Sequence, residues 1–197
     1  MKLVVIAAAL TLLGCSDSKP GGEDKTPPEV EPTSPSELDP GRRVRRLSAD
    51  QFHKSLQVAT GQAWSKYDEF SSALGRADFA EITTEGADLS VTFDKLVLDA
   101  ARETCKKAVT ADQAGGTVIL RDATVSDRGE AEMVSNLQYL YMRFLGFKID
   151  SADDVRLSPW ISLLRDGDVT ALPDSTIAQR WEAVCIGLVT HPDFLTY

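Results

Sequence analysis

Residues 16–41 can contribute almost nothing to a hydrophobic core, and this constrains the fold more than any other feature of the sequence. The segment consists mainly of Pro, Gly, Ser, Thr, Glu and Asp, and its only large apolar residues are Val30 and Leu38. Such a composition buries too little apolar surface to offset the entropy lost on ordering. We therefore expect a disordered linker over residues 15–41 and a single folded domain over residues 42–197, a usual size for one domain.

An apolar segment precedes this linker. After Lys2, residues 3–13 are uncharged and rich in Leu, Val, Ile and Ala. The run is too short for a membrane-spanning helix, which needs about 20 apolar residues, and it fits the apolar region of an export signal. The sequence therefore predicts a signal peptide over residues 1–14.

Leu12, Leu13, Gly14 and Cys15 resemble the lipobox of bacterial lipoproteins. The resemblance implies that Cys15 carries a diacylglycerol thioether, that the signal is removed, and that the new amino terminus is acylated, for example with palmitate. Ser16 is not the aspartate that retains such proteins at the inner membrane, so it favours the outer membrane, although Asp17 leaves the choice open. The alternative is a buried or free cysteine after an uncleaved segment. If Cys15 is lipidated, the membrane is a partner of the protein through the lipid anchor.

The charge of the chain limits its other partners. The formal net charge is −9 and the sequence pI is about 4.7. A chain this acidic is repelled by phosphate backbones, so nucleic acid is excluded as the main partner.

Apolar spacing predicts an all-α fold, an irregular bundle of five or six helices behind the disordered tether. Helical periodicity or capping patterns occur over residues 48–61, 90–109, 130–145, 151–164 and 174–191. We expect Ser48, Ser151 and Asp174 to cap three of these helices, and Pro159 to begin a new helical segment within residues 151–164. Residues 62–86 favour only short helical turns and loop. Residues 117–120 favour either a short strand or an extended loop.

The two ends of the expected domain resemble a known family. Residues 45–52 (RRLSADQF) are similar to the opening of the planctomycete cytochrome C-associated domains of unknown function, and residues 190–195 (THPDFL) are similar to the terminus of a second domain in that set. Residues 143–148 and 85–88 depart from the family pattern. The resemblance implies a role beside an enzyme or cytochrome but supplies no reaction.

We find no catalytic constellation and predict no enzyme activity, metal or cofactor. Covalent haem needs Cys-x-x-Cys-His, which cysteines at 15, 105 and 185 cannot form. His53 and His191 are expected to be structural or solvated. Asp153 and Asp154 are expected to be favourable charges at a helix start.

Two clusters are candidate interaction sites. Arg42, Arg43, Arg45 and Arg46 could touch anionic headgroups or an acidic partner, or could be a solvated cluster that packs its stems on the first helix and pairs with domain carboxylates. The second cluster is a set of four aromatic residues, Trp64, Tyr67, Phe70 and Phe79. These residues could form a recognition surface, but aromatic residues at such spacing more often belong to the core.

Cys105 and Cys185 would be the only thiols left once Cys15 is acylated in an oxidising compartment. Each lies on the apolar face of an expected helix, so a disulfide is plausible. Two separate buried cysteines fit equally well, because a helix face fixes direction and not distance. The sequence as a whole predicts a lipid-anchored envelope protein with a binding or scaffolding domain, or an accessory domain of a separately encoded envelope enzyme or cytochrome system, with an envelope protein as partner.

Overall fold

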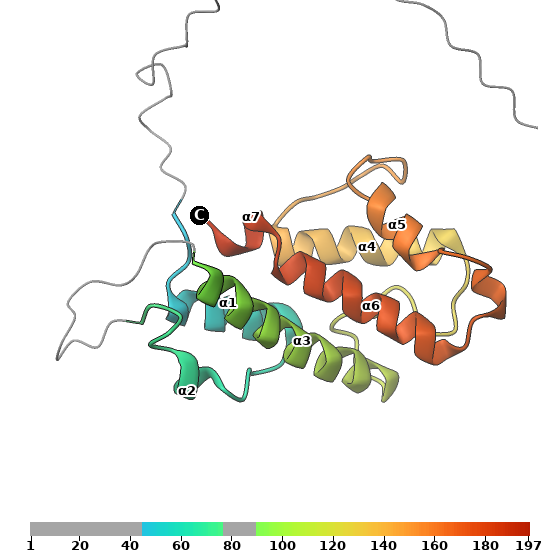
Figure 1. Cartoon of the computed structure of the whole chain (residues 1–197). Helices are drawn as coiled ribbons and strands as arrows, with labels where there is room; N and C mark the ends of the chain where they lie inside the picture. The colour runs from blue at the N-terminus through green and yellow to red at the C-terminus, as the bar shows by residue number, and fades with distance from the viewer. Residues whose placement is uncertain (1–44, 77–89) are drawn as a thin grey trace, which may run out of the picture. The chain divides into compact units, whose positions relative to one another are not determined.

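The structure, a computed structural model, describes residues 45–76 and 90–197, and the regular elements in these ranges are helices joined by loops (Figure 1). An isolated bridge between Arg46 and Thr196 is the only β pairing among them. The helices are α1 (Ala49–Thr60), α2 (Tyr67–Phe70), α3 (Val91–Gln113), α4 (Glu130–Leu145), α5 (Ser158–Leu164), the 3₁₀ turn η2 (Val169–Ala171), α6 (Asp174–Val189) and α7 (Pro192–Leu195). The all-α prediction is confirmed for the described residues; α2 and α7 are one-turn helices beyond the expected five or six. The predicted tether lies outside these ranges.

The core is centred on α3 and α6, which lie side by side (Figure 1). α3 begins because the Ser90 side chain accepts a hydrogen bond from the Phe93 amide. Small residues on its buried face, Ala100, Ala101 and Ala108, allow close approach of the neighbouring helices. α6 contributes larger side chains, among them Ile177, Trp181, Val184 and Leu188.

α1 covers another side of α3. Its start is a complete capping box, in which Ser48 and Gln51 each bond the other's backbone amide, as the sequence predicts. Gly61 ends the helix with a φ of 67°, a left-handed conformation that glycine adopts without strain. Phe52 meets Phe93 edge to face, with ring centroids 6.3 Å apart, and so joins α1 to the core.

α4 and α5 pack against α6. The Tyr141 hydroxyl links the two helices, because it donates to the Arg156 carbonyl at 2.8 Å and accepts from the Trp160 indole at 2.8 Å. Trp160 in turn lies against Gly187 of α6, where a Cβ would come within 2.5 Å of the ring. A side chain at this position would push α5 away from α6.

The segment between α3 and α4 is an extended loop, with no strand over residues 117–120. The buried Asp112 carboxylate accepts hydrogen bonds from three consecutive amides, those of Val118, Ile119 and Leu120. Asn136 of α4 accepts from the next two amides and donates to the Ile119 carbonyl. Two buried side chains thus take the place of a strand partner.

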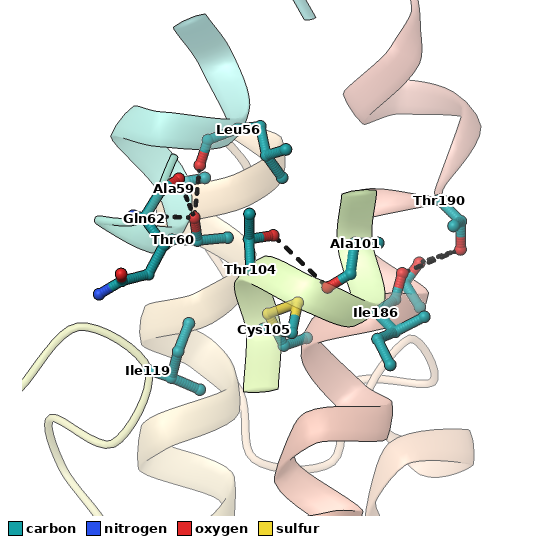
Figure 2. Close-up of a disulfide and its surroundings, with 12 residues drawn as sticks. Leu56, Ala59, Thr60, Gln62, Ala101, Thr104, Cys105, Ile119, Ile186 and Thr190 are labelled. Carbon is teal, nitrogen blue, oxygen red and sulfur yellow. Dashed lines mark hydrogen bonds between the residues drawn. A yellow bond between two sulfur atoms is a disulfide. The ribbon is translucent and has the colours of Figure 1, made fainter. Parts of the chain in front are cut away.

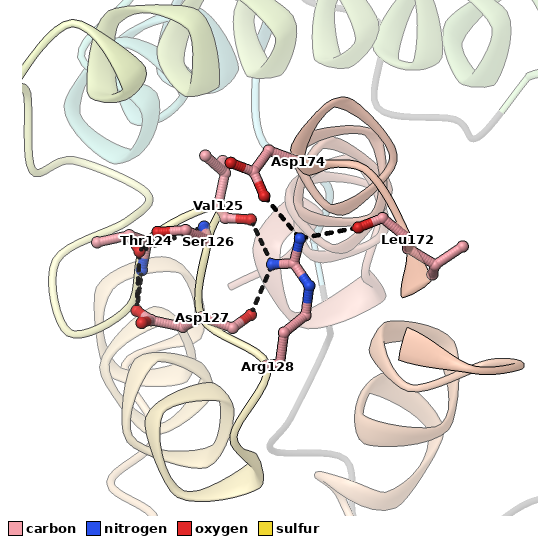
Figure 3. Close-up of polar contacts among 7 residues, drawn as sticks. All are labelled: Thr124, Val125, Ser126, Asp127, Arg128, Leu172 and Asp174. Atoms are coloured by element: carbon pink, nitrogen blue, oxygen red, sulfur yellow. Dashed lines mark hydrogen bonds and ion pairs between the residues drawn. The ribbon is translucent and has the colours of Figure 1, made fainter. Parts of the chain in front are cut away.

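Arg128 fastens the end of this loop to the start of α6 (Figure 3). Its guanidinium donates to the carbonyls of Val125 and Leu172 and pairs with the Asp174 carboxylate at 2.6 Å. Asp174 is the first residue of α6, and Pro173 occupies the N-cap, so the predicted Asp174 cap is wrong by one position.

The predicted helix start at Ser151 and Asp154 is also wrong. The Asp154 carboxylate accepts from the Arg156 amide and guanidinium, and these bonds lower the pKa of Asp154 to about 2. This local arrangement forms a turn, and α5 begins only at Ser158, with Pro159 in its first turn. Asp153 and Asp154 therefore lie in a turn and not at a helix start.

The two ends of the described domain are paired. The Arg45 and Tyr197 backbones exchange two hydrogen bonds of 3.0 and 2.9 Å, and the Leu47 amide donates to the Leu195 carbonyl at 2.8 Å. Residues 45–52 and 190–195, which carry the family resemblance, therefore meet in space. No described helix is both long enough and apolar enough to cross a bilayer.

Candidate functional site

A groove of about 530 Å³ lies between α3 and the segment that contains α2, and we call it the α2–α3 groove. Its lining combines four basic side chains, two acidic ones and three apolar ones, namely Lys66, Lys95, Arg102, Lys106, Asp99, Glu103, Trp64, Phe70 and Leu96. The lining thus carries two more basic than acidic side chains, although the whole chain has a net charge of −9.

The charged wall of the groove is one stripe of α3. Lys95, Asp99, Arg102 and Lys106 follow one another at spacings of four, three and four residues, which places them on one face of a helix. The opposite face is the buried one that packs in the core, so the core fixes the direction of this stripe.

The floor of the groove is aromatic. Trp64 and Phe70 stack with ring centroids 6.0 Å apart and an interplanar angle of 16°. Trp64 is only 3% exposed and Phe70 is half-buried. Of the predicted aromatic set, Trp64 and Tyr67 are core residues, and Phe79 lies outside the described residues.

A polar cluster holds α2 against α1 and so fixes the second wall. The Tyr67 hydroxyl donates to the Asp50 carboxylate, which also pairs with Arg76 at 3.6 Å. The His53 ring stacks on Tyr67, with centroids 3.8 Å apart. Burial, followed by the hydrogen bond to Asp50, raises the pKa of Tyr67 far above its usual value, so the hydroxyl keeps its proton. We call Asp50, His53, Tyr67 and Arg76 the α1–α2 latch.

Both carboxylates of the groove are already engaged. Lys95 binds Asp99 at 2.9 Å and Lys107 binds Glu103 at 2.6 Å, and the Ser65 amide donates to Glu103 at 3.0 Å. The Lys95 hydrogen bond lowers the pKa of Asp99, with Arg102 and Lys66 adding to the effect. Burial opposes ionisation of Glu103, but its hydrogen bonds from Lys107 and Ser65 hold its pKa below the usual value.

Three cations of the groove have no such partner. Lys66, Arg102 and Lys106 are exposed and form no ion pair with any residue in 45–76 or 90–197. Their charged groups stand beside an apolar floor, an arrangement that can hold a ligand with both anionic and apolar groups.

The predicted arginine cluster divides in the structure. Cys15, Arg42 and Arg43 lie outside the described residues, and the Arg45 side chain is exposed. Arg46 is only 8% exposed: its guanidinium lies 4.0 Å from the Phe93 ring centroid and donates to the Leu74 carbonyl. Arg46 therefore packs on α3, where the sequence reasoning expected either an interaction surface or a stem packed on the first helix.

Both histidines make structural contacts. His53 belongs to the α1–α2 latch and contacts Gln57 at 3.0 Å. His191 accepts a hydrogen bond from the Asp193 amide and so caps α7.

Cys105 and Cys185 are joined in the structure by a disulfide that links the two central helices, with Cα atoms 5.8 Å apart (Figure 2). Both residues are fully buried. In Figure 2 the hydroxyl groups of Thr104 and Thr190 donate to carbonyls of their own helices, those of Ala101 and Ile186.

Sequence reasoning missed the groove, although part of its signal is visible. The stripe of charged residues at helical spacing on α3 can be read from the sequence, but a charged stripe is also the ordinary solvent face of a helix. Lys66 and Trp64 are distant in sequence from that stripe, and only the fold brings them beside it.

No protein-family model, no curated protein and no solved structure matches this chain. The resemblance carried by residues 45–52 and 190–195 therefore stays a prediction.

Proposed function

We propose that this chain is a lipid-anchored protein of the cell envelope whose helical domain binds an envelope protein partner and has no catalytic activity of its own. The anchor is proposed from the sequence alone: an apolar signal, the lipobox-like residues that end at Cys15, and a polar linker after them. Two or more acyl chains would anchor the protein stably, since each buried methylene contributes about 0.8 kcal/mol. Ser16 favours the outer membrane.

The α2–α3 groove is the observation that supports a binding role. Lys66, Arg102 and Lys106 lie on two walls of the groove without ion-pair partners in the described ranges. An ordinary solvent-exposed helix face does not explain this arrangement, because such a face needs no partly buried aromatic residues beside its cations.

The anchor is tested by expressing the full chain and its Cys15→Ser variant in a Gram-negative host. We expect the wild-type protein in the outer-membrane fraction with the mass of the acylated chain that begins at residue 15. The variant should be released from membranes or should keep its signal. Identical mass and fractionation of the two proteins would contradict the anchor.

The binding role is tested by cross-linking in the same cells. A photo-reactive amino acid replaces Lys95, at one end of the groove, and in a control protein replaces Lys54 of α1, which lies outside it. We expect an adduct of discrete mass with an envelope protein from position 95 only, and its loss when Arg102→Glu and Lys106→Glu are added. The same adducts from both positions, or none from either, would contradict the proposal.

The second candidate function is that of an accessory domain for a separately encoded envelope enzyme or cytochrome system. The observation that favours it is that residues 45–52 and 190–195, which resemble the cytochrome C-associated domains, meet at one end of the fold, where the Leu47 amide donates to the Leu195 carbonyl. A hydrolase or cytochrome gene that recurs beside the gene for this chain would support this role. Neighbouring genes without any such enzyme would contradict it.

A further inference from the structure

We infer that the α2–α3 groove binds an extended peptide segment in which acidic residues are interspersed with apolar residues or proline. The inference rests on the proposed binding function and adds the chemistry of the partner at the same site.

The length of the cationic stripe fits an extended peptide. Lys95 and Lys106 are eleven residues apart on α3, which at about 1.5 Å per residue is roughly 16 Å. An extended peptide rises about 3.3 Å per residue, so about five residues would lie along the stripe. A single phosphate or carboxylate would engage only one end of it.

The positions of the cations set where the acidic residues fall. Arg102 and Lys106 are one helical turn apart, about 6 Å, which is close to the separation of alternate side chains on an extended strand. Lys66 stands on the other wall. Glutamates or aspartates at alternate positions can therefore meet Arg102 and Lys106 from one edge of the peptide.

The floor determines what the intervening residues must be. Side chains that point to the other face would meet chiefly the half-buried Phe70, with the buried Trp64 and Leu96 behind it. An aromatic floor of this kind packs well against proline rings and aliphatic side chains. Charged residues at these positions would lose hydration without gaining a partner.

The engaged carboxylates exclude a densely charged polyanion. Asp99 and Glu103 lie in the groove between the cations, and their pKa values are held below the usual range, so both stay ionised near neutral pH. A nucleic-acid backbone, with one charge per about 1.7 Å of duplex, would place phosphates against them. A peptide instead offers backbone N–H donors to the same oxygens.

The test uses the protein from residue 16 to residue 197 and short synthetic peptides. Glu29 and Glu31 are replaced by serine in this protein, because residues 28–32 (PEVEP) of the linker match the first peptide and would compete with it. One peptide alternates glutamate with proline and valine, a second has lysine in place of glutamate, and a third has glycine in place of the apolar residues. Trp64 lines the groove, so its fluorescence reports binding, and Trp64→Phe separates its signal from those of Trp160 and Trp181. We expect saturable binding of the first peptide only, and weaker binding as salt screens the charges.

The variant Arg102→Glu with Lys106→Glu should weaken this binding at least about tenfold, since each substitution turns an attraction into a repulsion. The control Lys54→Glu makes a charge change of the same kind outside the groove and should leave the affinity within about twofold. Circular dichroism and melting temperatures show whether each variant is folded. Equal loss in the control, or equal binding of the lysine peptide, would overturn the inference.

Vesicles of phosphatidylcholine with and without phosphatidylglycerol serve as the other probe. If the protein binds the anionic vesicles through the groove but binds no peptide, the ligand of the groove is a lipid surface. That result would overturn the inference. If no peptide binds while position 95 still cross-links to an envelope protein, the partner chemistry is wrong and the proposed function stands. If the peptide binds but no cross-link forms in cells, the proposed function fails.

Discussion

At the scale of single residues, Asp112 determines the path of the loop between α3 and α4. Its buried carboxylate accepts three backbone hydrogen bonds, and two of the donors, the Ile119 and Leu120 amides, are themselves buried. The loop passes so close that a Cβ on Gly116 would lie 2.5 Å from the Asp112 oxygen. In a sheet, the carbonyl groups of a neighbouring strand would accept these backbone hydrogen bonds. Here a single carboxylate accepts all three.

Asp112→Ala should therefore be strongly destabilising. Each buried amide left without an acceptor costs about 1–3 kcal/mol, so we expect a loss of about 3 kcal/mol or more in the free energy of unfolding. Asp122→Ala is the control, because Asp122 is exposed and its side chain pairs, within residues 45–76 and 90–197, only with its neighbour Arg121. This substitution should cost less than about 0.5 kcal/mol. Denaturant titration measures both, and equal effects would contradict the role of Asp112.

His53 gives the domain a specific pH dependence. Burial lowers its pKa in the folded chain, against the opposing effect of Asp68 and Asp50, whereas the unfolded chain titrates near 6.5. Below that pH the unfolded chain binds a proton that the folded chain does not, so stability falls with decreasing pH. The melting temperature of His53→Gln should fall less than that of wild type between about pH 7 and about pH 5. Parallel curves would contradict this.

At the scale of elements, α2 depends on contacts outside itself. It has four residues and no side-chain cap, so its own hydrogen bonds cannot hold it. The α1–α2 latch supplies the missing contacts, since Tyr67 both stacks on His53 and donates to Asp50. The position of the wall that contains α2 therefore depends on the contacts of the latch.

Tyr67→Phe keeps the ring but removes the hydroxyl, so it should loosen α2 without unfolding the domain. We expect faster amide hydrogen exchange over residues 67–74 and unchanged exchange in α3 and α6. Tyr197→Phe, at an exposed position, is the matched control and should change neither. Faster exchange throughout the domain would show that the hydroxyl supports the whole fold and not α2.

The sequence predicts those elements whose limits are set locally. Ser48 caps α1 through bonds within a few residues, and that prediction is confirmed. Ser90 and Gly146 limit α3 and α4 in the same local way. Ser151 and Asp154 offer the same signal but use it to form a turn, which only the structure reveals. The groove and the path of residues 117–120 depend on contacts between distant segments, which local patterns do not contain.

At the scale of the whole molecule, the disulfide joins the two helices on which the core is built. It connects residues 80 apart in sequence, and the chain-entropy model gives roughly 4 to 5 kcal/mol for a loop of that length. This is a large share of the stability of a domain this size. The sequence left the bond undecided because it gives no distance between two helix faces.

Alkylation of the exported, unfolded protein should therefore modify no thiol without reductant and two after reduction, as measured by intact mass. The double variant Cys105→Ala and Cys185→Ala should melt at a lower temperature than wild type in the absence of reductant. Adding reductant to wild type should lower its melting temperature toward that of the variant. Two modified thiols without reductant would contradict the bond.

The pairing of Arg45 with Tyr197 means that the polypeptide enters and leaves this domain at one point. A unit with adjacent ends can be spliced into a surface loop of another protein while requiring the host loop to open by only the width of one backbone pair. The same geometry allows circular permutation: a short linker can join the two ends, and new ends can be cut in an exposed turn such as residues 150–156. We therefore expect the helical domain to fold both as an insert and in permuted form.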